Sequence, residues 1–218
     1  MTVSRQYLID DLSITESWRL FKIMAEIVDG FEELGDIGPA VSIFGSARVL
    51  PEDPLYAQAS QLAALLSQAG FAVITGGGPG IMEAANRGAA EADGKSVGLH
   101  IHLPLEQAAN KYITIRSDYR YFFIRKLMFV KYAMAYVALP GGYGTLDEVS
   151  EALVLIQTKR IKPFPIVFLG SEFWSGLVDW FRQTLLTRGF LGPDDLELFT
   201  IVDTPEEAVS FIRKHVIV

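Results

Sequence analysis

Short apolar runs alternate with longer amphipathic stretches along most of this chain. Seven runs have the length and the apolar character of strands, and they lie at 41–44, 71–74, 96–101, 113–115, 135–139, 166–169 and 199–202. Between them, apolar residues recur every three or four positions, which predicts helices at 55–69, 81–92, 121–133, 145–159, 173–187 and 205–214. Strands without polar alternation are buried on both faces. The pattern therefore predicts an α/β fold, a Rossmann-like doubly wound parallel sheet with helices on both faces.

A further helix is expected before the first strand. The segment Ser13–Glu16 has the spacing of a capping box, and apolar residues then recur at helical intervals from Trp18 to Phe31. Because this helix precedes the sheet, it must pack on the outside of the sheet or on a partner subunit. We therefore divide the chain into residues 1–36, a leader and helix, and residues 37–218, a single Rossmann-like nucleotide-binding domain.

The composition excludes several classes of function. The chain has 218 residues, a formal net charge of −7 and no cysteine. A nucleic-acid groove needs a basic stripe, and disulfides, thiolate metal sites and cysteine nucleophiles all need cysteine. No signal peptide is visible, and no apolar run reaches membrane-spanning length. We therefore expect a cytoplasmic protein that binds neither nucleic acid nor a membrane.

Two glycine-rich turns each follow a predicted strand and open a predicted helix. They are Thr75–Glu83, which reads Thr-Gly-Gly-Gly-Pro-Gly-Ile-Met-Glu, and Leu139–Glu148, which reads Leu-Pro-Gly-Gly-Tyr-Gly-Thr-Leu-Asp-Glu. Glycines let the backbone approach an anion, and a helix N-terminus supplies free N–H groups and a positive dipole end. Both turns fall at the carboxyl ends of strands, where open α/β sheets hold their ligands. They predict one phosphorylated ligand held from two sides.

Each turn has a second, purely structural interpretation. The first turn lacks the Gly-Lys-Ser/Thr ending of the loop that binds a nucleoside triphosphate. It also has Ile81 at the position where the dinucleotide-binding fingerprint ends in glycine. A monophosphate ligand is therefore favoured over a triphosphate or a dinucleotide. The alternative for the first turn is a conformational turn that needs positive φ. In the second turn Thr145 is expected at the N-cap and Glu148 at N3, so Glu148 could be an ordinary capping-box carboxylate.

These motifs together resemble the LONELY GUY family. The resemblance rests on the pattern Pro-Gly-Gly-x-Gly-Thr-x-x-Glu at 140–148 and on the glycine turn at 76–82. Other similar segments are Phe44–Arg48, Met82–Asn86, Glu106-Gln107 through Asn110, and Phe122–Lys126. The extra N-terminal helix is similar to the longer bacterial branch, and Pro79 stands where plant-like members have Ser. Members are nucleoside 5′-monophosphate phosphoribohydrolases that activate cytokinins, many of them labelled lysine decarboxylases.

The resemblance implies roles for particular residues. The catalytic pair of the family falls on Arg125 and Glu148, and its phosphate site falls on Gly77, Gly78, Gly142, Gly144 and Thr145. Further expected substrate contacts are Gly45, Ser46, Arg48, Gly80, Met82, Glu83, Lys126 and Gly141. Breaking an N-glycosidic bond builds positive charge on the ribose, which a carboxylate stabilises, and a guanidinium suits a phosphate. The alternative for Arg125 is a surface or ion-pair residue.

Other candidates have structural explanations that are at least as good. Arg48 could reach the nucleotide or be a structural arginine, and Glu83 could line the ribose pocket or simply favour the first helical turn. His100 and His102 share one strand face, but local spacing supplies no third metal ligand. The aromatic segment Tyr119–Phe123 could stack a base, although burial in the core explains most of it.

The sequence thus predicts hydrolysis of a purine nucleoside 5′-monophosphate, AMP or an N6-modified AMP, to free base and ribose 5-phosphate, with no cofactor. The first alternative is a non-catalytic nucleotide carrier or sensor, which would use the same turns. The second is a pyridoxal-phosphate decarboxylase, which needs a Schiff-base lysine together with a partner for the pyridine nitrogen, a pair that the sequence does not supply. The apolar excess, 50% of residues, predicts a homo-oligomer built from dimers, and the resemblance implies a site near the dimer interface.

Overall fold

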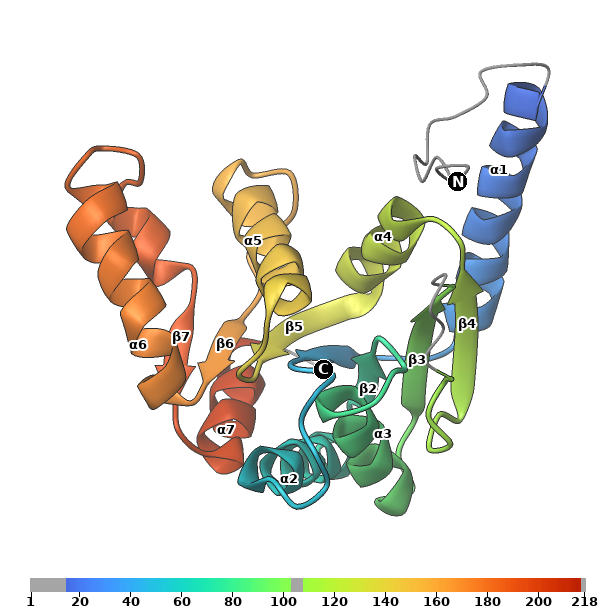
Figure 1. Cartoon of the computed structure of the whole chain (residues 1–218), viewed down its shortest axis with the longest axis horizontal. Helices are drawn as coiled ribbons and strands as arrows, with labels where there is room; N and C mark the ends of the chain where they lie inside the picture. The colour runs from blue at the N-terminus through green and yellow to red at the C-terminus, as the bar shows by residue number, and fades with distance from the viewer. Residues whose placement is uncertain (1–14, 103–107, 217–218) are drawn as a thin grey trace, which may run out of the picture.

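A seven-stranded, all-parallel sheet forms the centre of the protein (Figure 1). The structure is a computed structural model, and it describes residues 15–102 and 108–216. The strand order is β4-β3-β2-β1-β5-β6-β7. The strands are β1 (Ala40–Phe44), β2 (Ala72–Thr75), β3 (Ser96–Ile101), β4 (Ile115–Tyr119), β5 (Ala133–Ala138), β6 (Ile166–Leu169) and β7 (Thr200–Val202). The predicted doubly wound α/β fold is confirmed.

Helices cover both faces of the sheet (Figure 1). One layer holds α2 (Pro54–Gln68), α3 (Ile81–Glu91) and α7 (Pro205–His215). The other holds α1 (Thr15–Leu34), α4 (Phe122–Tyr132), α5 (Tyr143–Gln157) and α6 (Ser171–Trp180). The strands are apolar on both sides because alternate side chains, such as Ile43 and Phe44 of β1, enter the two different cores.

The sheet has its topological switch point between β1 and β5. The chain adds strands outward from β1 to β4 on one side, and then returns to place β5 on the other side of β1. Past the strand ends, the Leu139 N–H donates to the Phe44 carbonyl (2.8 Å) and the Ser46 N–H donates to the Pro140 carbonyl (3.0 Å). The loops that follow β1 and β5 therefore run side by side at the carboxyl edge, where this fold class binds ligands.

Three elements differ from the prediction. The strand expected at 113–115 instead spans Ile115–Tyr119 at the edge of the sheet. Ser117 and Tyr119 face inward there while Arg116 and Asp118 are exposed, so the strand has no continuous apolar run. The helix expected at 173–187 ends as α6 at Trp180 and continues as a π-helical turn at 181–186. A 3₁₀ helix at 193–197 was not predicted.

Some expectations lie outside the described residues. They are the leader at 1–12, the helix start at Ser13 and the motif positions Glu106 and Gln107. Within the described ranges, no helix has the length and apolarity needed to cross a bilayer. The division of the chain at residue 36 stays a prediction.

Candidate functional site

A cavity of about 700 Å³ opens at the switch point of the sheet. Its walls come from the loop after β1, one face of α4 and the first turns of α5. Small-ligand sites are typically cavities of about 300 to 1,000 Å³ at such points. Both glycine-rich turns reach this cavity, the first through Gly76 and the second through Gly142 and Gly144.

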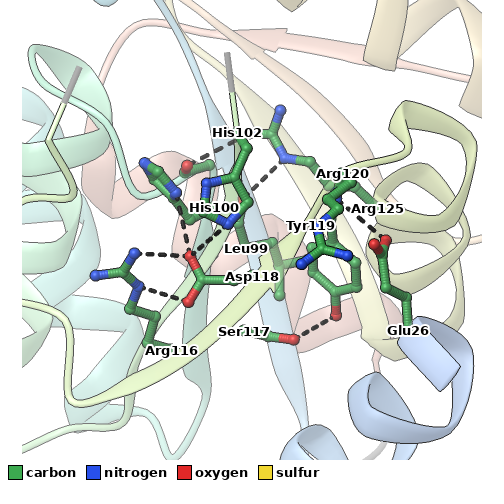
Figure 2. Close-up of polar contacts among 11 residues, drawn as sticks. Glu26, Leu99, His100, His102, Arg116, Ser117, Asp118, Tyr119, Arg120 and Arg125 are labelled. Carbon is green, nitrogen blue, oxygen red and sulfur yellow. Dashed lines mark hydrogen bonds and ion pairs between the residues drawn. The ribbon is translucent and has the colours of Figure 1, made fainter. Parts of the chain in front are cut away.

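Arg125 is held in the cavity wall by main-chain carbonyls. Its Nε donates to the Leu99 carbonyl (2.8 Å), a contact drawn in Figure 2, and its Nη2 donates to the Gly76 carbonyl (3.4 Å). A Cβ on Gly76 would overlap Nη2, so only glycine leaves room for the guanidinium. The guanidinium carbon also lies 5.3 Å from the centre of the Phe129 ring. Burial lowers the pKa of Arg125, and the Glu148 charge opposes that shift.

Glu148 is the more buried of two carboxylates that line the same cavity, the other being Asp147. Its side chain is only 12% exposed and lies 3.4 Å from the Lys126 ammonium, measured from Oε2. Burial raises the pKa of Glu148, whereas Lys126 and then Arg125 oppose the rise. The cavity therefore holds a fixed cation and a partly desolvated carboxylate, a combination typical of functional sites.

The start of α5 corrects the predicted cap. The helix begins at Tyr143 with Gly142 as its N-cap, and both Thr145 N–H and Leu146 N–H donate to the Gly142 carbonyl (3.1 Å each). Thr145 is therefore not the N-cap, and Glu148 is not at N3. The extended backbone of Gly142 places the N-cap three residues earlier than side-chain capping rules suggested. A capping box does not explain Glu148.

The first glycine turn is braced from behind by two buried asparagines. Asn110 donates from its N–H to the Gly77 carbonyl (2.9 Å) and from Nδ2 to the Gly78 carbonyl (3.0 Å). Asn110 Nδ2 also donates to Asn86 Oδ1 (2.9 Å), which accepts from the Thr75 hydroxyl (2.6 Å) as well. Both asparagines stand in segments that carry the family resemblance, but neither had a predicted role. For Asn86 the signal was a polar amide at a position that the helix pattern buries, whereas Asn110 lies in a loop and had no such signal.

A family model described as "Possible lysine decarboxylase" matches residues 82–212, which is more than half of the chain. The chain belongs to this family. The matched segment contains Arg125, Glu148 and the whole second glycine turn. The description of the family names lysine decarboxylation. Among the described residues, no lysine lines the cavity.

Curated proteins that are similar to this chain have more specific names. A cytokinin riboside 5′-monophosphate phosphoribohydrolase of Arabidopsis thaliana is 30% identical over 91 residues, which are 42% of each chain. The match thus spans about two fifths of the length of that relative. The resemblance to the LONELY GUY family is confirmed.

Solved structures of similar fold include a structural-genomics target that is 27% identical in sequence and has a TM-score of 0.62. The match covers 81% of this chain and 99% of that chain. A molybdenum cofactor binding protein of Rippkaea orientalis has a TM-score of 0.58 and 24% sequence identity. That match covers 81% of this chain and 96% of the other chain. The second likeness shows the shared fold alone.

Most of the site residues expected for this family come together in the cavity. Those that line it are Gly45, Ser46, Arg48, Met82, Arg125, Gly142, Gly144, Thr145 and Glu148. Those that the structure places outside its lining are Gly77, Gly78, Gly80, Glu83, Lys126 and Gly141. Substrate contacts by either group stay predictions.

Several residues outside the lining shape it indirectly. The Glu83 carboxylate turns to α2, where it accepts from the Tyr56 hydroxyl (3.1 Å). Gly80 has φ +68°, and a Cβ there would overlap the Ser46 carbonyl, which accepts from the Ile81 N–H at the start of α3 (3.0 Å). Gly80 therefore lets the loop after β1 join the first turn of α3.

His100 and His102 belong to a polar cluster on the β3–β4 edge (Figure 2). His100 Nδ1 lies 3.2 Å and His102 Nε2 lies 3.9 Å from Asp118 Oδ1. Arg116 donates to both oxygens of the same carboxylate, at 2.8 and 2.7 Å. Within the described part of the chain, no group of three or more side chains is arranged to hold a metal ion. His100, His102 and Arg116 thus gather around one carboxylate, that of Asp118.

The aromatic segment at 119–123 is less buried than expected. Tyr119 is fully buried and its hydroxyl accepts from the Ser117 hydroxyl (2.6 Å), but Phe122 and Phe123 are exposed. Phe122 lines the cavity together with Tyr143, whose side chain is 92% exposed. Core burial therefore explains Tyr119 but not the two phenylalanines.

Proposed function

We propose that the protein hydrolyses the N-glycosidic bond of purine nucleoside 5′-monophosphates, such as AMP or a cytokinin riboside monophosphate. The observation that carries the proposal is the placement of Arg125, fixed by two main-chain carbonyls, and the Glu148 carboxylate in one cavity. The names of the curated relatives support the same reaction class.

The chemistry assigns opposite duties to the two charges. As the bond from C1′ to the purine nitrogen breaks, positive charge develops on the ribose, and the Glu148 carboxylate stabilises it or orients water. The water supplies hydroxide to C1′ and a proton to the leaving base, giving ribose 5-phosphate and free purine. Burial of Glu148 strengthens this electrostatic contact because it removes competing solvent.

The phosphate is the natural counter-ion for Arg125. In the described part of the chain no carboxylate forms an ion pair with its guanidinium, whose planar donors suit an anionic oxygen. The N-terminal N–H groups of α5, opened by Gly142 and Gly144, offer a second anion-binding element on the opposite wall.

Product analysis tests the reaction directly. Purified protein is incubated with AMP, GMP, IMP, CMP and isopentenyladenosine monophosphate, and free base is measured by chromatography. We expect base release from a purine monophosphate and far slower release from adenosine, because phosphate binding energy is lost from the transition state. Equal turnover of adenosine and AMP, or no release from any monophosphate, would contradict the proposal.

A homodimer that closes the cavity is part of the proposal. Among the described helices, exposed large apolar side chains lie on α1, α4, α5 and α6, and none lies on α2, α3 or α7. Two of them, Phe122 and Tyr143, belong to the cavity wall. An apolar, solvent-facing wall of this kind is typical of a protein–protein interface. A second copy packed here would bring its own side chains to the site.

Light scattering combined with activity tests this dimer. Phe123→Glu places a charge beside the cavity wall without touching its lining, and we expect it to lower both the mass and base release. Leu50→Glu, an exposed apolar position near the other helix layer, is the matched control. A fully active wild-type monomer would contradict the interface.

A non-catalytic carrier of a phosphorylated ligand is the second candidate. It is favoured by the fold shared with a protein named for molybdenum cofactor binding, and by an anion-binding Arg125 that does not itself require catalysis. Tight ligand binding without base release would select this function over hydrolysis.

A further inference from the structure

Both asparagines of the chain lie behind the first glycine turn and pair with each other. Asn86 belongs to α3 and Asn110 to the loop before β4, and both residues are buried. Asn110 Nδ2 donates to Asn86 Oδ1 (2.9 Å). A hydrogen-bonded pair of buried groups can often be replaced by apolar groups of the same shape without loss of stability. Two buried amides in contact here therefore indicate a role beyond packing.

The side-chain amide of Asn86 uses its full hydrogen-bonding capacity. Its Oδ1 accepts from the Thr75 hydroxyl (2.6 Å) and from Asn110 Nδ2. Its Nδ2 donates to Ser96 Oγ (2.8 Å) and to the Val97 carbonyl (3.2 Å). The amide thus ties the end of β2, the start of β3 and the loop before β4 together. Because the oxygen meets donors and the nitrogen meets acceptors, its orientation is fixed.

Two of the elements that Asn86 ties together are the ones that hold Arg125. Arg125 Nε donates to the Leu99 carbonyl of β3 (2.8 Å; Figure 2), and Nη2 donates to the Gly76 carbonyl (3.4 Å). Gly76 directly follows β2, and Leu99 lies on the strand whose start accepts from Asn86. The spacing of the two carbonyls that hold the guanidinium therefore depends on the hydrogen bonds of Asn86.

The first glycine turn directs its polar groups toward this network. The Gly77 N–H donates to the Thr75 hydroxyl (3.0 Å), and the Gly77 carbonyl accepts from the Asn110 N–H (2.9 Å). The Gly78 carbonyl accepts from Asn110 Nδ2 (3.0 Å). Of the glycines at 76–78, only Gly76 lines the cavity. The N–H of Gly77, which the sequence suggested as a phosphate donor, therefore already has a partner inside the protein.

We propose that Asn86 and Asn110 are positioning residues for Arg125. They hold the first glycine turn and β3 at the spacing that aims the guanidinium into the cavity, so the turn acts through Arg125 and not as a phosphate cradle. A fully paired network of buried amides is rigid enough for this task. The role rests on the proposed function, because Arg125 matters here as the group that meets the phosphate. The position of the guanidinium itself can be measured without catalysis.

Asn110→Ala is the first test, because it removes the bonds to Asn86 and Gly78 but changes no residue of the cavity lining. Crystal structures of variant and wild type should show the guanidinium displaced by about an ångström, and kcat/KM for base release from AMP should fall about 100-fold. Added to Arg125→Ala, the change should cause no further loss. An unmoved guanidinium, or additive losses, would overturn the positioning role. A displaced guanidinium in a protein that releases no base would support the role and contradict hydrolysis.

A milder pair of variants serves if Asn110→Ala does not fold. Thr75→Val keeps the volume but loses the hydroxyl that joins Asn86 to the Gly77 N–H, whereas Thr75→Ser keeps that hydroxyl. We expect Thr75→Val to displace the guanidinium and to lower kcat/KM about 10-fold, since the Asn110 contacts survive, and Thr75→Ser to stay near the wild type. A wild-type Arg125 position in Thr75→Val would overturn the role.

Thr204→Ala is the control for stability alone. It removes the hydroxyl that caps α7 and accepts from the Glu207 N–H, and neither residue lines the cavity. We expect its melting temperature to fall while kcat/KM stays at the wild-type value. An equal loss of kcat/KM in Thr204→Ala and Thr75→Val would show that lower stability, and not a displaced Arg125, reduces activity.

Discussion

The Lys126 ammonium lies 3.4 Å from the Glu148 carboxylate, yet Lys126 does not line the cavity. Its Nζ also lies 2.9 Å from both Asp147 Oδ2 and Glu151 Oε2. Arg125 and Lys126 are neighbours on α4, but the first turns to β2 and β3 while the second turns to α5. Helix α4 thereby fixes Arg125 and Glu148 relative to each other.

Lys126→Met should move the acid limb of the activity profile to higher pH. Burial raises the pKa of Glu148 and Lys126 holds it down, so loss of the ammonium raises that pKa further and removes the ionised form at low pH. The measurement is kcat/KM for base release across pH. Lys126→Arg keeps the charge and should keep the acid limb. If KM for AMP rises and the limb does not move, Lys126 binds substrate, as the sequence predicted.

Glu148→Gln should reduce base release by about 100-fold to 1,000-fold, the usual worth of a preorganised electrostatic contact. The amide keeps the shape but lacks the charge that an oxocarbenium-like transition state needs. Glu172→Gln makes the same change in the first turn of α6 and serves as the control. Wild-type activity in folded Glu148→Gln would remove Glu148 from the mechanism.

The same variant should melt at a higher temperature than the wild type at neutral pH. The pKa of Glu148 is raised in the folded state, so its contribution to stability is present below the unfolded pKa and is lost as pH rises through the folded pKa. The uncharged amide avoids that loss. Melting curves from about pH 3.5 to 8 should show the difference vanish near the ordinary glutamate pKa of about 4.3. A lower melting temperature at neutral pH would show that the ionised carboxylate stabilises the fold.

Gly76→Ala should lower activity by about 100-fold, because the methyl group takes the space of Arg125 Nη2 and displaces the guanidinium by about an ångström. The double variant with Arg125→Ala should be no slower than Arg125→Ala alone, since both changes act on one side chain. Gly176→Ala, where a Cβ meets nothing within 4 Å, is the control. Additive losses would show that Gly76 acts independently of Arg125.

Local patterns determined much of this protein. Apolar runs and helical periodicity located β1, β6 and most helices to within about two residues, because buried parallel strands carry no polar alternation. The glycine turns marked the ligand edge, since such turns follow strands in any doubly wound sheet. Those inferences need only neighbours in sequence.

Tertiary structure decided what depends on distant contacts. Edge strand β4 owes its position to pairing with β3, where Thr114 and Ile115 meet Ser96 and Val97, and not to its own composition. The direction of Lys126 toward α5 and the close contact of Gly76 with Arg125 required the packing of α4 on the sheet. Periodicity showed that α1 is apolar, but only the packed structure showed that one side of the helix is buried and the other remains exposed, because a pattern of side chains does not say which neighbour each side meets.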